Sequence, residues 1–197
     1  MAAQSDKGNY LAGRILLAMP AMADPRFHRA VIFICAHDAN GAMGLVINHR
    51  LPGLEFSQLL QQMKIKAEDD VPGKPLADTL PVMSGGPVES ARGFILHSPD
   101  FAQADTIKVT DEFSVTGTVD ALRAVAGGKG PQRMLFILGY AGWTAGQLDQ
   151  EIQDNAWLVA DANPDVVFGA PPDEKWDRTI RMLGINPAML SGDAGRA

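Results

Sequence analysis

The side chains best suited to bind a ligand or move a proton stand where predicted strands end and the chain turns. His37 and His97 each end an apolar segment, whereas Arg92 and Tyr140 lie beside glycine-rich turns. Such positions commonly display functional groups, because they are accessible while the strands hold them in place. His37, Arg92, His97 and Tyr140 are therefore our candidate ligand-binding residues. The simpler interpretation is structural: a histidine can satisfy turn backbone, and Arg92 can pair with Glu89.

Further polar residues occupy similar positions, and for each a structural role is the first interpretation. Asn155, for example, precedes Trp157 and can cap a turn. The other residues in this group are Asp24, Arg26, Asn48, Glu89 and Asp154.

Catalytic and metal-binding signatures are absent from the sequence. No two of its four histidines, His28, His37, His49 and His97, have the spacing of ligands on one helix face. There is no Gly-x-Ser-x-Gly turn, phosphate loop or dinucleotide pattern. We predict no metal and no cofactor. A Ser-His-Asp arrangement can assemble from distant segments, so the sequence leaves open whether a reaction is catalysed.

Cys35 is the single cysteine, which excludes an intrachain disulfide and a thiolate zinc cluster. It ends the apolar run that begins at Val31, where a free cysteine commonly behaves as a small buried hydrophobe. A reactive thiol would need an accessible cationic neighbour, and only His37 is near in sequence.

Two glycine-rich turns could bring backbone N–H groups to an anion: Gly85-Gly86, and the cluster of Gly139, Gly142 and Gly146. The alternative, which we favour, is that these glycines permit unusual backbone angles or close packing. The second cluster predicts a corner. A buried strand over 133–138 would turn through Gly139 to Trp143, and Thr144 would cap a helix with Gln147 as its capping-box partner.

Composition bounds the class of protein. The 197 residues are 46% hydrophobic, which suits one domain with a substantial core. The net charge of −6, without a basic stripe, argues against specific binding to duplex DNA. No apolar run is long enough to cross a membrane, and the first residues lack the pattern of a secretory signal. We therefore expect no membrane association and a cytoplasmic location.

Apolar runs and turn residues predict the elements that must position these side chains. Asn40-Gly41 indicates a hairpin, with Ile32, Ile34, Leu45, Ile47, Leu135 and Ile137 buried together on adjacent strands. Predicted strands cover 14–19, 30–36, 44–48, 93–97, 106–109, 133–138, 157–159 and 166–168. One predicted helix covers 58–64; Ser57 starts it, and Leu59, Leu60 and Met63 form its buried stripe. The other predicted helices cover 119–126, a segment from Thr144, and a segment capped by Asp173 that buries Trp176, Ile180 and Leu183.

Helices and strands do not alternate regularly, which favours an α+β fold over a doubly wound one. We predict a mixed, largely antiparallel sheet, curled, with helices packed outside. The expected organisation is a flexible leader over 1–10, one domain over 11–190 with an exposed loop at 66–79, and a tail over 191–197.

A long, ordered series of segments carries a resemblance to a known family: 19–20, 24–27, Val31, His37, 41–48, 85–88, 92–97, 138–143, 146–148, 151–152, 155–157, 171–172, Trp176 and 183–185. Across about residues 11–190 the chain resembles the YqgE/AlgH family of bacterial proteins. Ala30 departs from the serine often found there, and Asp149 from the usual glutamate. The resemblance implies a sheet bent into a partial barrel and members often described as transcriptional regulators; it brings no established catalytic residue, cofactor or substrate.

We therefore predict a non-enzymatic regulatory or interaction protein that acts through a protein or small-molecule partner. The alternative is a small-molecule-binding protein or enzyme with a pocket at the strand ends. A polar pocket that gathers His37, Arg92, His97 or Tyr140 would favour the alternative. An exposed apolar patch without such a pocket would favour the first reading. Direct DNA binding is the weakest of the three because of the acidic charge.

Overall fold

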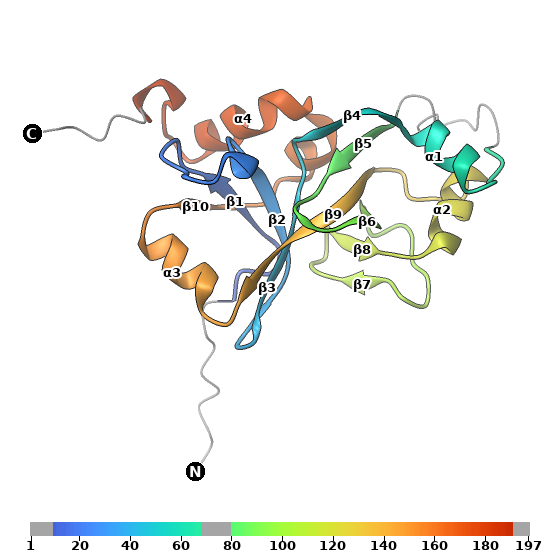
Figure 1. Ribbon diagram of the computed structural model, residues 1–197, viewed down its shortest axis with the longest axis horizontal. Coiled ribbons are helices and arrows are strands. Elements are labelled where there is room, and N and C mark those ends of the chain that lie inside the picture. The colour runs from blue at the N-terminus through green and yellow to red at the C-terminus, as the bar shows by residue number, and fades with distance from the viewer. Residues whose placement is uncertain (1–9, 68–79, 191–197) are drawn as a thin grey trace, which may run out of the picture.

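The computed structural model describes residues 10–67 and 80–190 (Figure 1). The α-helices are α1 (Phe56–Gln62), α2 (Val119–Ala126), α3 (Gln147–Gln153) and α4 (Lys175–Met182). The strands are β1 (Arg14–Ala18), β2 (Val31–Asp38), β3 (Gly41–Val46), β4 (Arg50–Glu55), β5 (Pro81–Ser84), β6 (Val88–His97), β7 (Ile107–Lys108), β8 (Ser114–Thr116), β9 (Met134–Thr144) and β10 (Trp157–Asp161).

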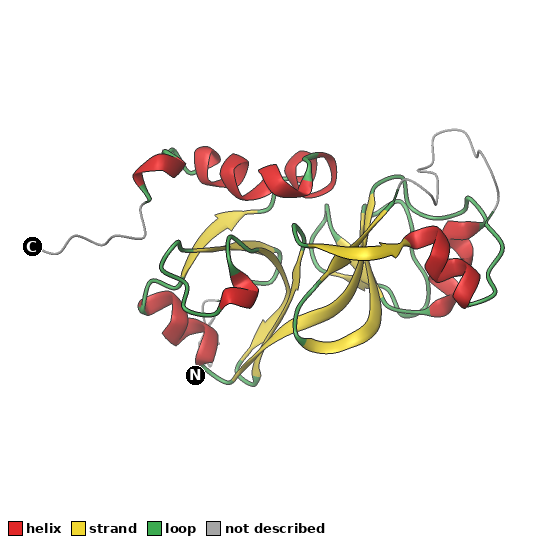
Figure 2. Ribbon diagram, turned by 45° about the horizontal axis from the view of Figure 1, so that its top comes forward, coloured by secondary structure: helices red, strands yellow, loops and turns green. Residues whose placement is uncertain are grey.

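All these strands join one mixed sheet in the order β10-β1-β2-β3-β9-β6-β8-β7, with β5 on β9 and β4 on β5. Only the β5–β9 pair is parallel among the described strands. The sheet curls into a half-barrel, with α3 and α4 toward one end and α1 and α2 at the other (Figures 1 and 2). The predicted α+β class and partial barrel are confirmed.

The β2–β3 hairpin forms as the Asn40-Gly41 turn predicts, with Asp38 opposite Gly41. β3 in turn pairs with β9, so the three strands that carry the predicted core are neighbours. The six predicted residues are buried, but they divide between two faces. Leu45, Ile47, Leu135 and Ile137 join one cluster, whereas Ile32 and Ile34 join another. Successive side chains of a strand point to opposite faces, and both faces of this hairpin are covered.

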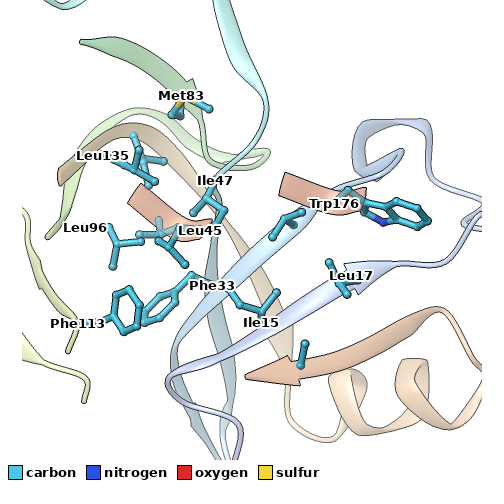
Figure 3. Packing of buried hydrophobic residues seen from close by; sticks show 14 of the residues in the cluster. Ile15, Leu17, Phe33, Leu45, Ile47, Met83, Leu96, Phe113, Leu135 and Trp176 are labelled. Carbon is cyan, nitrogen blue, oxygen red and sulfur yellow. The ribbon is translucent and has the colours of Figure 1, made fainter. Parts of the chain in front are cut away.

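The larger cluster fills the concave side of the sheet around Phe33, Leu45 and Phe113 and extends to Trp176 of α4 (Figure 3). Trp176 and Ile180 are buried as predicted, and the Trp176 indole donates to the carbonyl of Ala18 at 2.9 Å. Leu183 is 39% exposed, because α4 ends at Met182 and the apolar stripe stops with it. Asp173 lies in a short 3₁₀ turn before α4 rather than capping the helix.

Two other local predictions need correction. α1 begins at Phe56 with Glu55 and Gln58 forming its capping box, so Ser57 is not the cap, and Met63 is exposed rather than buried. Residues Asp165–Gly169 form a π-helical turn instead of a strand. The Asn163 side chain accepts from the N–H of Asp165 and so starts this turn. The apolar run over 166–168 does not by itself distinguish such a turn from a strand.

The predicted corner at Gly139 is a continuous strand. β9 runs on to Thr144, and its second half pairs with β3, with Gly44 opposite Ala141. Gly139 has φ +77°, so it lets the strand bend without ending, whereas Gly142 is not in the left-handed region. α3 starts only at Gln147, after Gly146. Pairing with a distant strand therefore overrides the local turn signal.

Residues 1–9 of the predicted leader, 68–79 of the predicted loop and the predicted tail over 191–197 lie outside the described residues. Among the helices that the structure describes, none combines the length and apolarity needed to cross a membrane.

Candidate functional site

His37 is held in a structural setting. Its side chain is 5% exposed, and Nδ1 accepts from the N–H of Leu11 at 3.2 Å. Nε2 lies 3.9 Å from an oxygen of Asp149, and Tyr10 meets the ring edge-on. The imidazole thus ties the start of the described chain to β2 and to α3.

His97 is fully buried. The Ser98 carbonyl, 2.8 Å from Nδ1, can only accept, so Nδ1 carries the proton. Nε2 of the neutral ring then accepts from the Thr116 hydroxyl at 2.8 Å. Burial lowers the pKa of His97, which favours this neutral form. The residue joins the ends of β6 and β8 and has no access to solvent.

Arg92 and Tyr140 lie close together through Phe94. The Arg92 guanidinium stands 5.1 Å from the centre of the Phe94 ring, and the Tyr140 ring meets Phe94 edge-on at 6.0 Å. Arg92 pairs with Glu89 at 3.2 Å, the local ion pair that the spacing predicted. Partial desolvation, followed by a hydrogen bond with Glu89, raises the pKa of Tyr140. The four candidates therefore do not meet at one place.

A cavity of about 410 Å³ opens on the concave side of the sheet, and we call it the barrel mouth. It carries Arg92 but neither histidine nor Tyr140. Burial raises the pKa of Cys35 in its wall to about 12, so that thiol stays protonated near neutral pH. The lining residues are Cys35, Ala36, Met43, Arg92, Phe94, Asp105, Ile107, Val115, Gly117 and Thr118.

A second cavity, of about 460 Å³, lies on the other side, beside α3. We call it the tryptophan pocket because Trp143 from β9 and Trp157 from β10 form part of its wall. Four segments build it: the turn over 21–27, Pro87, the end of β9, and α3 continuing into β10. Figure 1 shows α3 below β10 and beside the end of β9.

Glu151 of α3 organises this pocket. Its Oε2 accepts from both indoles, Trp143 Nε1 at 2.9 Å and Trp157 Nε1 at 2.8 Å. Its Oε1 accepts from Gln147 Nε2 at 2.9 Å. The two indole rings stand at 78° to each other, and Phe27 meets Trp157 edge-on. One half-buried carboxylate thus fixes two aromatic side chains that come from different strands.

The pocket is acidic. Asp24, Glu151 and Asp154 line it, against one cation, Arg26. Arg26 is engaged by Asp24, with Nη2 2.6 Å from Oδ2, and this contact lowers the pKa of the Asp24 carboxyl. Within the described part of the chain, no group of three or more His, Cys, Asp or Glu side chains is placed to hold a metal ion.

Trp143, Glu151 and Trp157 are not among the candidate ligand-binding residues predicted from the sequence. A usable signal exists: buried indoles need hydrogen-bond acceptors, and Glu151 lies between the two tryptophans in the chain. In addition, the segments 24–27, 85–88, 138–143, 146–148 and 155–157, which carry the family resemblance, all contribute to this one pocket.

Comparison with known proteins identifies one family. Residues 15–188 match the family model described as AlgH-like. A Bradyrhizobium protein named only as a UPF0301 protein is 50% identical over 192 residues, which cover 96% of this chain and 89% of the relative. A Ruegeria pomeroyi protein with the same family name is 49% identical and covers 95% and 99% of the two chains.

Two solved structures share the fold. The solution structure of the AlgH protein from Pseudomonas aeruginosa is similar with a TM-score of 0.75, 40% identity and full coverage of both chains. A crystal structure of a Corynebacterium diphtheriae protein gives a TM-score of 0.68 over 91% of this chain and 89% of its own, at 22% identity. The second likeness concerns the fold alone.

Proposed function

The chain belongs to the AlgH-like family, and from that premise we propose that it is a non-enzymatic regulatory protein that binds its partner in the tryptophan pocket. The observation that carries this proposal is Glu151, which holds two indoles rigid beside a cavity of about 460 Å³. Pre-formed cavities of this size, with aromatic walls and a few fixed polar groups, are typical of ligand sites.

The side chains available favour binding over catalysis. The four polar candidates of the sequence are dispersed, and His97 is neutral and buried. In the tryptophan pocket the Glu151 oxygens are already occupied by three donors, an arrangement suited to holding a shape rather than to accepting a proton from a substrate.

The proposed setting is the cytoplasm, and the proposed partner is a small molecule or a side chain of another protein. The chain carries a net charge of −6, and its acidic pocket would repel a phosphate backbone, so direct binding to duplex DNA is not part of the proposal. The regulatory part of the proposal rests on the descriptions common in the family.

The test is a thermal-shift screen against metabolites, repeated with two space-filling variants. A ligand that binds only the native state raises the melting temperature. Ala156→Leu fills the tryptophan pocket from a half-buried residue that lines it and packs beside Trp143 and Trp157. Ala36→Leu is the matched control in the barrel mouth. We expect the thermal shift to disappear in Ala156→Leu and to persist in Ala36→Leu.

The second candidate function is small-molecule binding in the barrel mouth, as a carrier or an enzyme with a pocket at the strand ends. Arg92 above the Phe94 ring is the observation that favours it, since a polar group beside a largely apolar cavity suits an amphipathic ligand. The same screen separates the two, because a ligand of the barrel mouth loses its thermal shift in Ala36→Leu and keeps it in Ala156→Leu.

A further inference from the structure

We infer that the group recognised by the tryptophan pocket is an organic cation, a primary ammonium or a guanidinium. This inference rests on the proposed binding role of the pocket and names the chemistry of its ligand. It is carried by the charges that line the cavity and by the partners that those charges have.

The first step concerns charge that is left uncompensated. Arg26 and Asp24 neutralise each other at 2.6 Å. Glu151 and Asp154, three residues apart and on one side of α3, take part in no ion pair among the described residues. Their hydrogen-bond donors are uncharged: two indoles and the Gln147 amide for Glu151, and the Gln150 amide for Asp154. The cavity therefore holds two carboxylates without a counter-ion.

The second step concerns the walls. Phe27, Trp143 and Trp157 border the same cavity as these carboxylates. Aromatic rings beside carboxylates favour cations, because the ring faces are electron-rich. The pocket already contains one example, since Arg26 is bound by Asp24 while its guanidinium stands 5.9 Å from the centre of the Phe27 ring. A ligand cation beside Glu151 and Asp154 would likewise lie among carboxylates and aromatic side chains.

The third step concerns the end of α3 that reaches the pocket. Asp154 and Asn155 follow the last turn of this helix, and Asn155 has φ +58°, a left-handed conformation that is uncommon for residues other than glycine. The carbonyl end of a helix carries partial negative charge, which adds to the attraction for a cation. The barrel mouth differs, because its Arg92 and Asp105 balance each other in charge.

Tryptophan fluorescence provides a direct readout. The chain has three tryptophans, and the third, Trp176, is buried in the core under Arg29, away from the pocket. In a Trp176→Phe background the emission comes from Trp143 and Trp157 alone. The probes are agmatine, which carries both cationic groups, the tripeptide Gly-Arg-Gly, and butyrate as an anion of similar size.

We expect agmatine or the tripeptide to change the emission saturably, and butyrate to have no effect. Raising sodium chloride to about 0.5 M should weaken binding, because salt screens the attraction. Glu151→Gln should weaken it about tenfold and Asp154→Asn about threefold, the effects of losing a half-buried and an exposed charge. Asp149→Asn, on the same helix but outside the pocket, is the matched control and should leave affinity unchanged.

The possible outcomes test the charge of the ligand and the location of the binding site separately. Binding of agmatine alone identifies a small molecule as the source of the cation, and binding of the tripeptide alone identifies a protein side chain. If butyrate binds and Ala156→Leu abolishes that binding, the ligand is not a cation although the proposed site stands. If neither cationic probe binds at millimolar concentration, or if binding is equally strong in Asp149→Asn, Asp154→Asn and Glu151→Gln, the inference is wrong. Ligands from the screen whose thermal shift is unchanged in Ala156→Leu would instead contradict the proposed site itself.

Discussion

Glu151 and Lys175 are two charged residues with uncharged partners in very different places. Glu151 borders a cavity that opens to solvent and accepts from two indoles and an amide. Lys175 is 1% exposed and donates to the carbonyls of Ile47 at 3.1 Å and Val167 at 2.6 Å. Neither side chain takes part in an ion pair among the described residues.

The comparison shows that an unpaired charge can bind a ligand only where solvent and ligand can reach it. No ligand can reach Lys175, and desolvation lowers its pKa to about 8. Its ammonium connects the end of β3 to the π-helical turn at Asp165–Gly169, so we interpret it as part of the architecture. Glu151 also lacks a charged partner, but it borders an open cavity, where a ligand can supply the opposite charge.

Reversing the charge at Lys175 should have the largest effect on stability. In Lys175→Glu a carboxylate would face two carbonyl oxygens that cannot donate to it, and an unpaired buried charge costs about 3–5 kcal/mol. Lys175→Met is the matched control, because an apolar side chain of similar length removes the charge with its desolvation cost and leaves only the two carbonyl oxygens without a donor; we expect it to cost about 1–3 kcal/mol, less than Lys175→Glu in the same experiment. Urea unfolding measures the free energy of unfolding of both variants. A loss of less than about 1 kcal/mol in Lys175→Glu would contradict the prediction and show that water reaches this site.

The pH dependence of stability should reveal the same residue. Between about pH 8 and 10.5 the native state has released the Lys175 proton, whereas the unfolded chain still holds it. The free energy of unfolding therefore rises with pH through this window, by at most about 3.4 kcal/mol, and this gain is lost again as the pH falls back to about 8.

The Lys175→Met protein supplies the baseline for this measurement. Burial raises the pKa of Cys35 to about 12, which acts with the opposite sign above pH 9. Subtracting the baseline isolates Lys175, and a difference curve that stays flat from pH 7.5 to 10.5 would contradict the lowered pKa.

Substituting Glu151 should lower the free energy of unfolding less than Lys175→Glu does, by an amount that depends on whether the new side chain can accept a hydrogen bond. Glu151→Ala leaves the N–H groups of Trp143 and Trp157 without their acceptor, at about 1–3 kcal/mol. Glu151→Gln retains one acceptor oxygen, so we expect it to lose less than about 1 kcal/mol. Chemical denaturation followed by tryptophan emission tests both. Equal losses would mean that the carboxylate charge, rather than the shared acceptor, holds the indoles.

The sequence predicts what local chemistry determines. The Asn40-Gly41 hairpin and the helix over 119–126 appear where predicted, because turn residues and apolar spacing specify them within a few positions. β9 could not be predicted beyond Gly139, because its last residues become a strand by pairing with β3. Glu151 was missed for the same reason: its role depends on two indoles that the fold brings together. Of the candidate residues, Arg92 and Tyr140 lie close together through Phe94, and the two histidines are separate structural links.

Two glycines of β9, Gly139 in the interior and Gly142 at the tryptophan pocket, should differ in how well they tolerate a side chain. An added Cβ at Gly139 would lie 2.7 Å from the carbonyl oxygen of Gly86, and its φ of +77° is unfavourable for any other residue. We expect Gly139→Ala to lose about 1–3 kcal/mol and Gly142→Ala less than about 0.5 kcal/mol. Thermal unfolding of both variants provides the comparison, and similar losses would mean that Gly142 is also constrained.

The smallest expected effect is at Thr144, where the sequence had predicted a helix cap. Thr144 is the last residue of β9, and Gln147 Oε1 accepts from its backbone N–H at 3.0 Å, a bond that alanine keeps. Only the exposed hydroxyl contact at 3.3 Å would be lost. Thr144→Ala should therefore cost less than about 0.5 kcal/mol.

Thr118 is the matched control for this substitution, because its hydroxyl accepts from the N–H of Ala121 and caps α2. Thr118→Ala should cost about 0.5–2 kcal/mol, as the loss of an N-cap does. Urea unfolding of the pair measures the difference. If Thr144→Ala lowers the free energy of unfolding as much as Thr118→Ala, the Thr144 side chain does cap α3, and the tryptophan pocket depends on the start of that helix. If it costs less, Gln147 alone connects the end of β9 to Glu151, and the pocket is built from the strand rather than from the turn.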